Sequence, residues 1–159
     1  LSLHANTVAE GTIRGAAVYT LSEDASDETA AALADLENSA DLFGGEVEPG
    51  LDSTLTRVLG DLARIETDAR SVILAGAMVD GLRESVGVIP TRPHRSAGFA
   101  VLKAPDIPSL LIELGFLSDA EDRAAMLSPE WRERAIAGVI EGLDLWQGRD
   151  AALLEGARR

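Results

Sequence analysis

Apolar residues recur along the chain with two patterns, one typical of strands and one typical of helices. Short apolar runs predict four strands, at residues 1–4, 15–21, 98–102 and 109–113. The last run is almost wholly apolar, which favours a strand that is covered on both faces of its sheet.

Helical spacing of apolar residues predicts the longer elements of the first half. A helix is expected over residues 26–41, and a break follows at residues 43–50, where glycine and proline gather. Apolar residues then recur at helical spacing over residues 53–86, with charges on the opposite face. This pattern predicts one long helix, or two helices with a kink near residues 67–71.

The C-terminal part carries two helix-start signals. The pattern Ser118-x-x-Glu121 predicts a capping box at the start of a short helix. Ser128 followed by Pro129 predicts the start of the last helix. Its buried stripe is expected to contain Trp131, Ala135, Val139, Leu143 and Trp146. Residues 89–96 are expected to form a loop, and residues 148–159 a loosely held tail.

The order of the elements is strand, strand, helix, long helix, strand, strand, helix, helix. This order indicates an α/β layered domain. Four strands make a small sheet for this much helix, and the strand at residue 1 needs a neighbour. We therefore expect further strands upstream of this segment.

The composition and net charge of the chain argue against several classes of binding partner and site. The 159 residues fit one domain, and 14 basic against 27 acidic residues give a formal charge of −13. This charge argues against nonspecific binding to nucleic acid or to an anionic membrane surface. The chain has no cysteine, which excludes disulfides and cysteine zinc sites. No apolar run approaches the roughly 20 residues of a membrane span, so no membrane insertion is expected.

Glu113 is the first candidate for chemistry. It stands at the end of the apolar run 109–113, directly before Leu114 and Gly115. Burying an unpaired carboxylate is costly, so a charge in this place needs a reason. It could deprotonate a metal-activated water and then protonate a leaving amine. A glutamate that pairs with an arginine or caps a helix explains the pattern equally well.

His4 is the second candidate, because a strand end fixes the direction of its imidazole and neutral imidazole is a common zinc ligand. A single histidine in such a place is more often a hydrogen-bonded structural residue. His94 lies in a basic loop with Arg92 and Arg95, and Lys103 follows nearby. These residues could contact an anionic substrate group, although a solvated, salt-bridged surface is the simpler interpretation.

Several segments together resemble one family. They are 2–6, with the letters SLHAN; 15–22, with GAAVYTLS; 37–41, with ENSAD; 59–63, with LGDLA; 97–109, with AGFAVLKAPDIPS; and 113–118, with ELGFLS. In this order they resemble the catalytic domain of zinc-dependent N-acetylmuramoyl-L-alanine amidases of the amidase-3 type. Such enzymes cleave peptidoglycan during cell separation.

The resemblance implies a fold and a site. The expected fold is a three-layer α/β/α domain around a mostly parallel sheet, lacking its first strands. Zinc in this family is held by two histidines and a glutamate; His4 matches the third ligand, and Glu113 matches the catalytic glutamate. Matches to the other two ligands lie upstream of residue 1. The chain therefore resembles the C-terminal portion of the domain, over residues 1–147, followed by the tail.

The resemblance also implies regulation and location. Some members carry an inserted helix that covers the zinc site until an activator displaces it. Residues 27–51 match that region, and Glu37 is the candidate autoinhibitory residue. The implied partners are peptidoglycan and an envelope-associated activator with a LytM-type domain. The implied location is the periplasm or cell envelope, reached by a signal peptide that is not in this chain, and a monomer is expected.

Two other functions remain open. The chain could be a non-catalytic envelope or interaction fragment, because one histidine and one glutamate fall short of the usual three zinc ligands. Another zinc hydrolase on a similar scaffold, such as a carboxypeptidase, is the third possibility. No phosphate-binding loop, serine-hydrolase elbow or nucleic-acid motif is present in the sequence.

Overall fold

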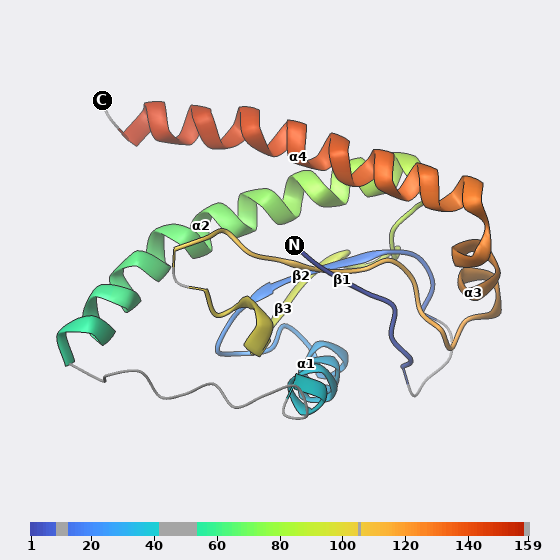
Figure 1. Ribbon diagram of the computed structural model, residues 1–159, viewed down its shortest axis with the longest axis horizontal. Helices are drawn as coiled ribbons and strands as arrows, with labels where there is room; N and C mark the ends of the chain where they lie inside the picture. The colour runs from blue at the N-terminus through green and yellow to red at the C-terminus, as the bar shows by residue number, and fades with distance from the viewer. Residues whose placement is uncertain (9–12, 42–53, 105, 158–159) are drawn as a thin grey trace.

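A computed structural model describes residues 1–8, 13–41, 54–104 and 106–157 of the chain (Figure 1). Its sheet contains β1 (Ser2–His4), β2 (Ala17–Leu21), β3 (His94–Ala97) and β4 (Leu111–Glu113), in the order β1-β4-β2-β3. Strand β1 is parallel to β4, and β2 is parallel to β3. The central pair β2 and β4 is antiparallel, so the sheet is mixed.

Helices cover both faces of this sheet. They are α1 (Glu28–Asp41), α2 (Thr54–Ser85), α3 (Ala120–Leu127) and α4 (Pro129–Ala157), with a short 3-10 helix η1 at Ala100–Leu102. Helices α2 and α4 lie together on one side of the sheet, whereas α1 lies on the other side (Figure 1). This arrangement is the expected three-layer α/β/α fold.

The period of two along β2 divides the core between the two faces. Ala17 and Tyr19 point to the α1 side, where they pack with Leu33 of α1 and with Phe99. Val18 points to the opposite side, where it packs with residues of α2. Each face of the sheet thus has its own apolar cluster.

Three of the four predicted strands are confirmed: those at residues 1–4, 15–21 and 109–113. The strand predicted over residues 98–102 is wrong. This stretch turns at Phe99, whose N–H donates to the Ala97 carbonyl, and then forms η1. Its apolar side chains are buried against α1 without joining the sheet: Phe99 and Leu102 belong to the α1-side cluster.

The loop predicted over residues 89–96 is also wrong in part, because it contains most of β3. Three of the four residues of β3 are polar, so the run lacks a strand pattern. Its backbone pairs in parallel with residues Val18 to Leu21 of β2. Pairing with an already buried neighbour, rather than local propensity, makes this segment a strand.

The long helix predicted over residues 53–86 is confirmed as one continuous helix, α2. The expected loop at residues 43–50 and residue 53, where the helix was predicted to begin, lie outside the described residues. The predicted start of α4 is confirmed, because the Trp131 N–H donates to the Ser128 hydroxyl at 3.2 Å.

Two C-terminal predictions are corrected. Helix α3 is capped by Asp119, which accepts from the N–H groups of Glu121 and Asp122, and not by Ser118. The tail expected from residue 148 is helical as far as Ala157. A bidentate pair between Arg70 on α2 and Asp150 on α4 holds this end of the helix.

Helices α2 and α4 cross at glycines. A Cβ atom at Gly81 would lie 2.3 Å from the Gly138 carbonyl oxygen and 2.7 Å from the Gly142 nitrogen. Only hydrogen fits at such a distance, so the glycine allows the two backbones to approach closely. Within the described ranges, no helix combines the length and apolar character that a bilayer crossing requires.

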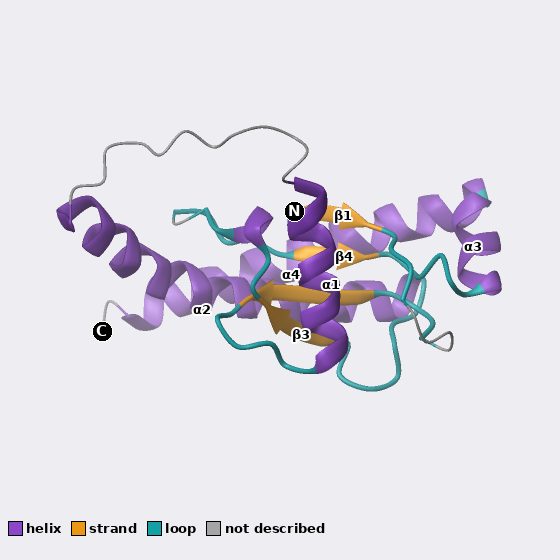
Figure 2. Ribbon diagram, turned by 90° about the horizontal axis from the view of Figure 1, so that it is seen from below, coloured by secondary structure: helices purple, strands orange, loops and turns teal. Residues whose placement is uncertain are grey.

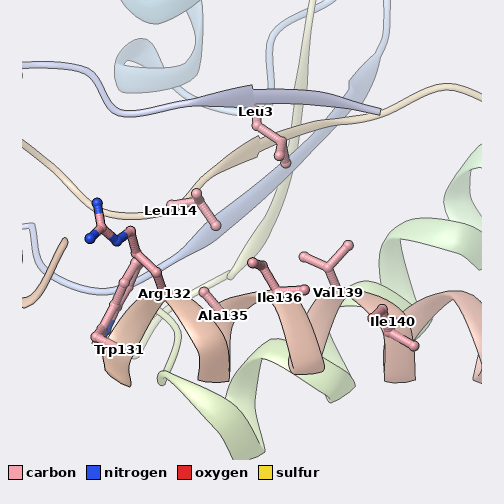
Figure 3. Close-up of a pocket in the computed structure, with 8 residues that line it drawn as sticks. All are labelled: Leu3, Leu114, Trp131, Arg132, Ala135, Ile136, Val139 and Ile140. Carbon is pink, nitrogen blue, oxygen red and sulfur yellow. The ribbon is translucent and has the colours of Figure 1, made fainter. Parts of the chain in front are cut away.

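An apolar groove of about 380 Å³ lies between the edge strand β1 and α4 (Figure 3). Leu3 and Leu114 point toward the helix, which presents Ile136 and Ile140 (Figure 3). Leu3 is 56% exposed, Ile136 60% and Ile140 54%. The groove is on the face of β1 opposite to His4, because successive side chains of a strand alternate between faces.

Candidate metal centre

The ends of two parallel strands bring His4 and Glu113 side by side. The register of β1 and β4 pairs Ser2 with Leu111 and His4 with Glu113. The Leu114 N–H donates to the His4 carbonyl at 3.0 Å and continues this pairing beyond the strand. Glu113 is fully buried, on the face of the sheet that carries α1.

Helix α1 supplies the third member of the cluster. Figure 2 shows α1 crossing the face of the sheet. Glu37 Oε2 lies 2.9 Å from His4 Nδ1. One ligand atom from each of His4, Glu37 and Glu113 can be chosen so that all three lie within 4.8 Å of one another. The three residues singled out from the sequence therefore meet in one place.

Asn6 joins the two carboxylates of the cluster. Its side-chain Nδ2 donates to Glu113 Oε1 at 2.7 Å and to Glu37 Oε1 at 2.6 Å. Its backbone N–H donates to Glu113 Oε2 at 2.9 Å. Asn6 was not among the predicted site residues, although an amide side chain two residues beyond a strand-end histidine was a usable signal.

Burial raises the pKa of the Glu113 carboxyl, because the charged form loses its hydration. The hydrogen bonds from Asn6 and the nearby His4 act in the opposite direction, and Glu37 adds to the rise. The net pKa is raised, so this carboxylate is a stronger proton acceptor than an exposed glutamate.

The arrangement around His4 fits a metal ion. Ser2 Oγ lies 2.8 Å from Nε2, so Nδ1 is the nitrogen that faces the carboxylate of Glu37. An unprotonated Nδ1 and a carboxylate oxygen both carry lone pairs, so their close approach needs a proton or a cation between them. One imidazole and two carboxylates are donors that Zn²⁺ accepts, and three protein ligands are usual at catalytic zinc sites.

The other candidates have partners of their own. His94 Nε2 lies 2.9 Å from the Thr20 hydroxyl, and burial lowers the pKa of its imidazole. Arg95 pairs with Asp27 at 3.2 Å. Lys103 is exposed, and its carbonyl accepts from Arg64. These contacts support the structural interpretation of the basic loop; its contact with a substrate stays a prediction.

Comparison with known proteins gives one family. Residues 1–144 match the family described as N-acetylmuramoyl-L-alanine amidase. The chain is 30% identical over 154 residues to the N-acetylmuramoyl-L-alanine amidase AmiC of Escherichia coli O6:H1, covering 96% of this chain and 36% of that protein. It is 30% identical over 144 residues to AmiA of Escherichia coli K12, covering 90% of this chain and 50% of that protein.

Solved structures agree on the fold. The CwlD amidase from Clostridioides difficile, solved in complex with the GerS lipoprotein, matches with a TM-score of 0.58 and 15% identity over 92% of this chain and 53% of that chain. The amidase Ami1 from Mycobacterium smegmatis matches with a TM-score of 0.55 and 20% identity over 93% of this chain and 53% of that chain. The chain thus spans between about a third and a half of the length of these relatives.

Proposed function

Because the chain belongs to the N-acetylmuramoyl-L-alanine amidase family, we propose that it is part of a peptidoglycan hydrolase that cleaves the amide bond between N-acetylmuramic acid and L-alanine. The observation that carries the proposal is the buried carboxylate of Glu113 beside His4, at the ends of two parallel strands. Relatives that bear the name of this activity support it.

His4 would be a ligand of the zinc ion, and the carboxylates of Glu37 and Glu113 each have an oxygen within 4.8 Å of a ring nitrogen of His4. Zinc, when bound, lowers the pKa of water to about 7 and polarises a carbonyl group. Glu113 accepts the proton of the attacking water and returns it to the nitrogen of the leaving L-alanine. The raised pKa of Glu113 suits both steps, because a group that first accepts and then donates a proton works best with a pKa nearer to neutral.

The role of Glu113 is tested by Glu113→Gln. The substitution keeps the size of the side chain but removes its basicity, so release of new amino groups from purified peptidoglycan should fall by about 10²–10⁴-fold. Zinc content, measured by elemental analysis, should stay unchanged. Glu133→Gln, at an exposed position of α4, is the matched control. Turnover by Glu113→Gln equal to that of the control would overturn the role.

We further propose that Glu37 is autoinhibitory within residues 27–51. Its carboxylate lies 2.9 Å from His4 Nδ1, where it blocks access to the nitrogen that would bind the metal. Displacement of α1 by a LytM-type activator in the periplasm or cell envelope would open the site during daughter-cell separation. Residues 42–51 of this region lie outside the described residues.

Glu37→Ala tests this regulation. Removing the carboxylate should raise peptidoglycan cleavage in the absence of any partner protein, because the position beside His4 becomes accessible to substrate. Glu28→Ala, at the exposed start of the same helix, should leave the rate unchanged. A lower rate in Glu37→Ala together with loss of zinc would instead identify Glu37 as a permanent ligand.

The second candidate function is a non-catalytic envelope or interaction fragment. The single histidine of the cluster favours it, because catalytic zinc usually has three protein ligands, whereas the closeness of Glu37 and Glu113 to this histidine favours a zinc site. Calorimetric titration of residues 1–159 with zinc, followed by a peptidoglycan assay, separates the two. Bound zinc with turnover supports the amidase, and absence of both supports the fragment.

A further inference from the structure

Asn6 donates hydrogen bonds to both carboxylates of the cluster formed by His4, Glu37 and Glu113. We propose that Asn6 is a positioning residue that fixes the Glu113 carboxylate in one orientation and couples it to the docking of α1 through Glu37. The catalytic importance of this positioning rests on the proposed function. The hydrogen bonds of Asn6 themselves do not depend on that function.

Both oxygens of Glu113 are held from one residue. Oε2 accepts from the Asn6 backbone N–H at 2.9 Å, and Oε1 accepts from Nδ2 at 2.7 Å. In the described part of the chain, Asn6 supplies every hydrogen bond that the Glu113 side chain accepts. Two bonds to the two oxygens stop rotation of the carboxylate, which a single bond would allow.

The backbone of Asn6 is itself anchored. Its carbonyl accepts from the Leu117 N–H at 2.7 Å, just beyond the end of β4. The segments that follow β1 and β4 are therefore tied to each other on either side of the Glu113 carboxylate. A donor on an anchored backbone can hold its acceptor in place, whereas a donor on a free loop would move with it.

The two hydrogens of the Asn6 amide serve two different elements. One is donated to Glu113 of β4, and the other to Glu37 of α1 at 2.6 Å. One neutral group thus brings two carboxylates together and offsets their repulsion. If α1 leaves the site, one of the two N–H groups loses its partner, so the amide becomes free to turn. Docking of α1 and orientation of Glu113 are coupled in this way.

Peptidoglycan cleavage tests the positioning. Asn6→Ala should lower the rate of cleavage by about 10²-fold while zinc content stays unchanged, because a misplaced base loses the geometry that proton transfer needs. Asn38→Ala is the matched control, because Asn38 also ties α1 down, through Gly98 O at 2.9 Å and the Ala100 N–H at 2.7 Å. An equal change of rate in both variants would show that only helix docking matters, and would overturn the proposal.

A second readout needs no metal. The chain has three side-chain amides, at Asn6, Asn38 and Gln147, so their NMR signals are readily assigned. The Asn6 amide protons should exchange with solvent at least ~10-fold more slowly than those of exposed Gln147, because both are hydrogen bonded. In Glu37→Ala the exchange of the Asn6 amide should accelerate.

The two failures are distinguishable. If the wild-type chain binds no zinc, the metal part of the proposed function fails, while slow exchange of the Asn6 amide still supports the positioning. If the Asn6 amide exchanges as fast as that of Gln147, the positioning fails whether or not zinc binds.

Discussion

At the scale of single residues, Tyr19 places a polar hydroxyl in the apolar cluster on the α1 side of the sheet. It is the only tyrosine of the chain, it is fully buried, and its hydroxyl has no hydrogen-bond partner among the described residues. Burial raises the pKa of this phenol to about 12.

The titration of Tyr19 can therefore be followed without interference from another tyrosine. Ultraviolet absorbance of the phenolate should show a midpoint near pH 12 in the native protein, and near pH 10 in denaturant. The unfolded chain releases this proton first, so the free energy of unfolding falls as the pH rises from about 10 toward 12. A native midpoint near 10 would contradict the buried environment.

Tyr19→Phe should leave the free energy of unfolding unchanged or raise it by up to about 1 kcal/mol. The substitution removes a buried hydroxyl that has no partner and keeps the ring, which packs edge-on against Phe99. Urea denaturation at pH 7 measures the change. A loss of more than about 1 kcal/mol would mean that the hydroxyl makes a stabilising contact.

The residues of the site differ in how far sequence could predict them. Motif resemblance was enough to select His4, Glu113 and Glu37. Their proximity depends on the pairing of β1 with β4 and on the docking of α1, which no local pattern encodes. Asn6 was missed because the value of an amide donor depends on acceptors 31 and 107 positions away along the chain.

At the scale of elements, the crossing of α2 and α4 depends on the absence of side chains. Gly81→Ala should destabilise the protein by about 1–3 kcal/mol, because the added Cβ meets the backbone of α4, which cannot move aside. Gly148→Ala should stabilise it by up to about 1 kcal/mol, because a Cβ atom at this helical glycine would meet no other part of the protein within 4 Å and alanine favours helix.

Chemical denaturation of the two variants measures this contrast. Both replace glycine by alanine in a helix, so they share the gain in helix propensity and differ only in the space around the new methyl group. Equal shifts in the two variants would contradict close contact between α2 and α4.

The ion pair of Arg70, midway along α2, and Asp150, in the C-terminal part of α4, also joins these helices. The hydrogen bonds from Arg70 hold the pKa of Asp150 below its usual value. The pair therefore adds stability above pH ~4, the pKa of an unfolded aspartate, and this contribution is lost as the pH falls through the lower native value.

Asp150→Asn should therefore lower the free energy of unfolding at pH 7 and have a smaller effect at pH 3. Urea denaturation at the two pH values provides the comparison, and Asp144→Asn, at an exposed position on the same helix, is the control. A loss that is the same at both pH values would show that the charge of Asp150 contributes nothing.

Sequence predicted the helices better than the strands. Helix α2 has 32 residues of sustained period, so its existence was evident. Strand β3 has four residues, three of them polar, and it is a strand only because β2 is available beside it. The apolar run that follows gave a false strand signal, because Phe99 and Leu102 reach the core from a turn.

At the scale of the whole molecule, the two helical layers differ in support. Helix α2 packs against both α4 and the sheet, whereas α1 contacts η1 and β3 among the described residues (Figure 1). Hydrogen exchange followed by mass spectrometry should show α1 opening at a lower free energy than the centre of α2. Identical protection of the two helices would mean that the domain opens only as one unit.

The three-residue pairing of β1 with β4 has a consequence for this whole arrangement. A slip by one residue would turn His4 toward the apolar groove and place Leu3 beside Glu37 and Glu113. Backbone hydrogen bonding alone distinguishes poorly between the two registers, because the N–H and C=O groups of the two strands can pair in either one. The contact of His4 with Glu37 exists in only one of them. The cluster of His4, Glu37 and Glu113 thus favours the alignment of the edge strand that brings His4 beside Glu37.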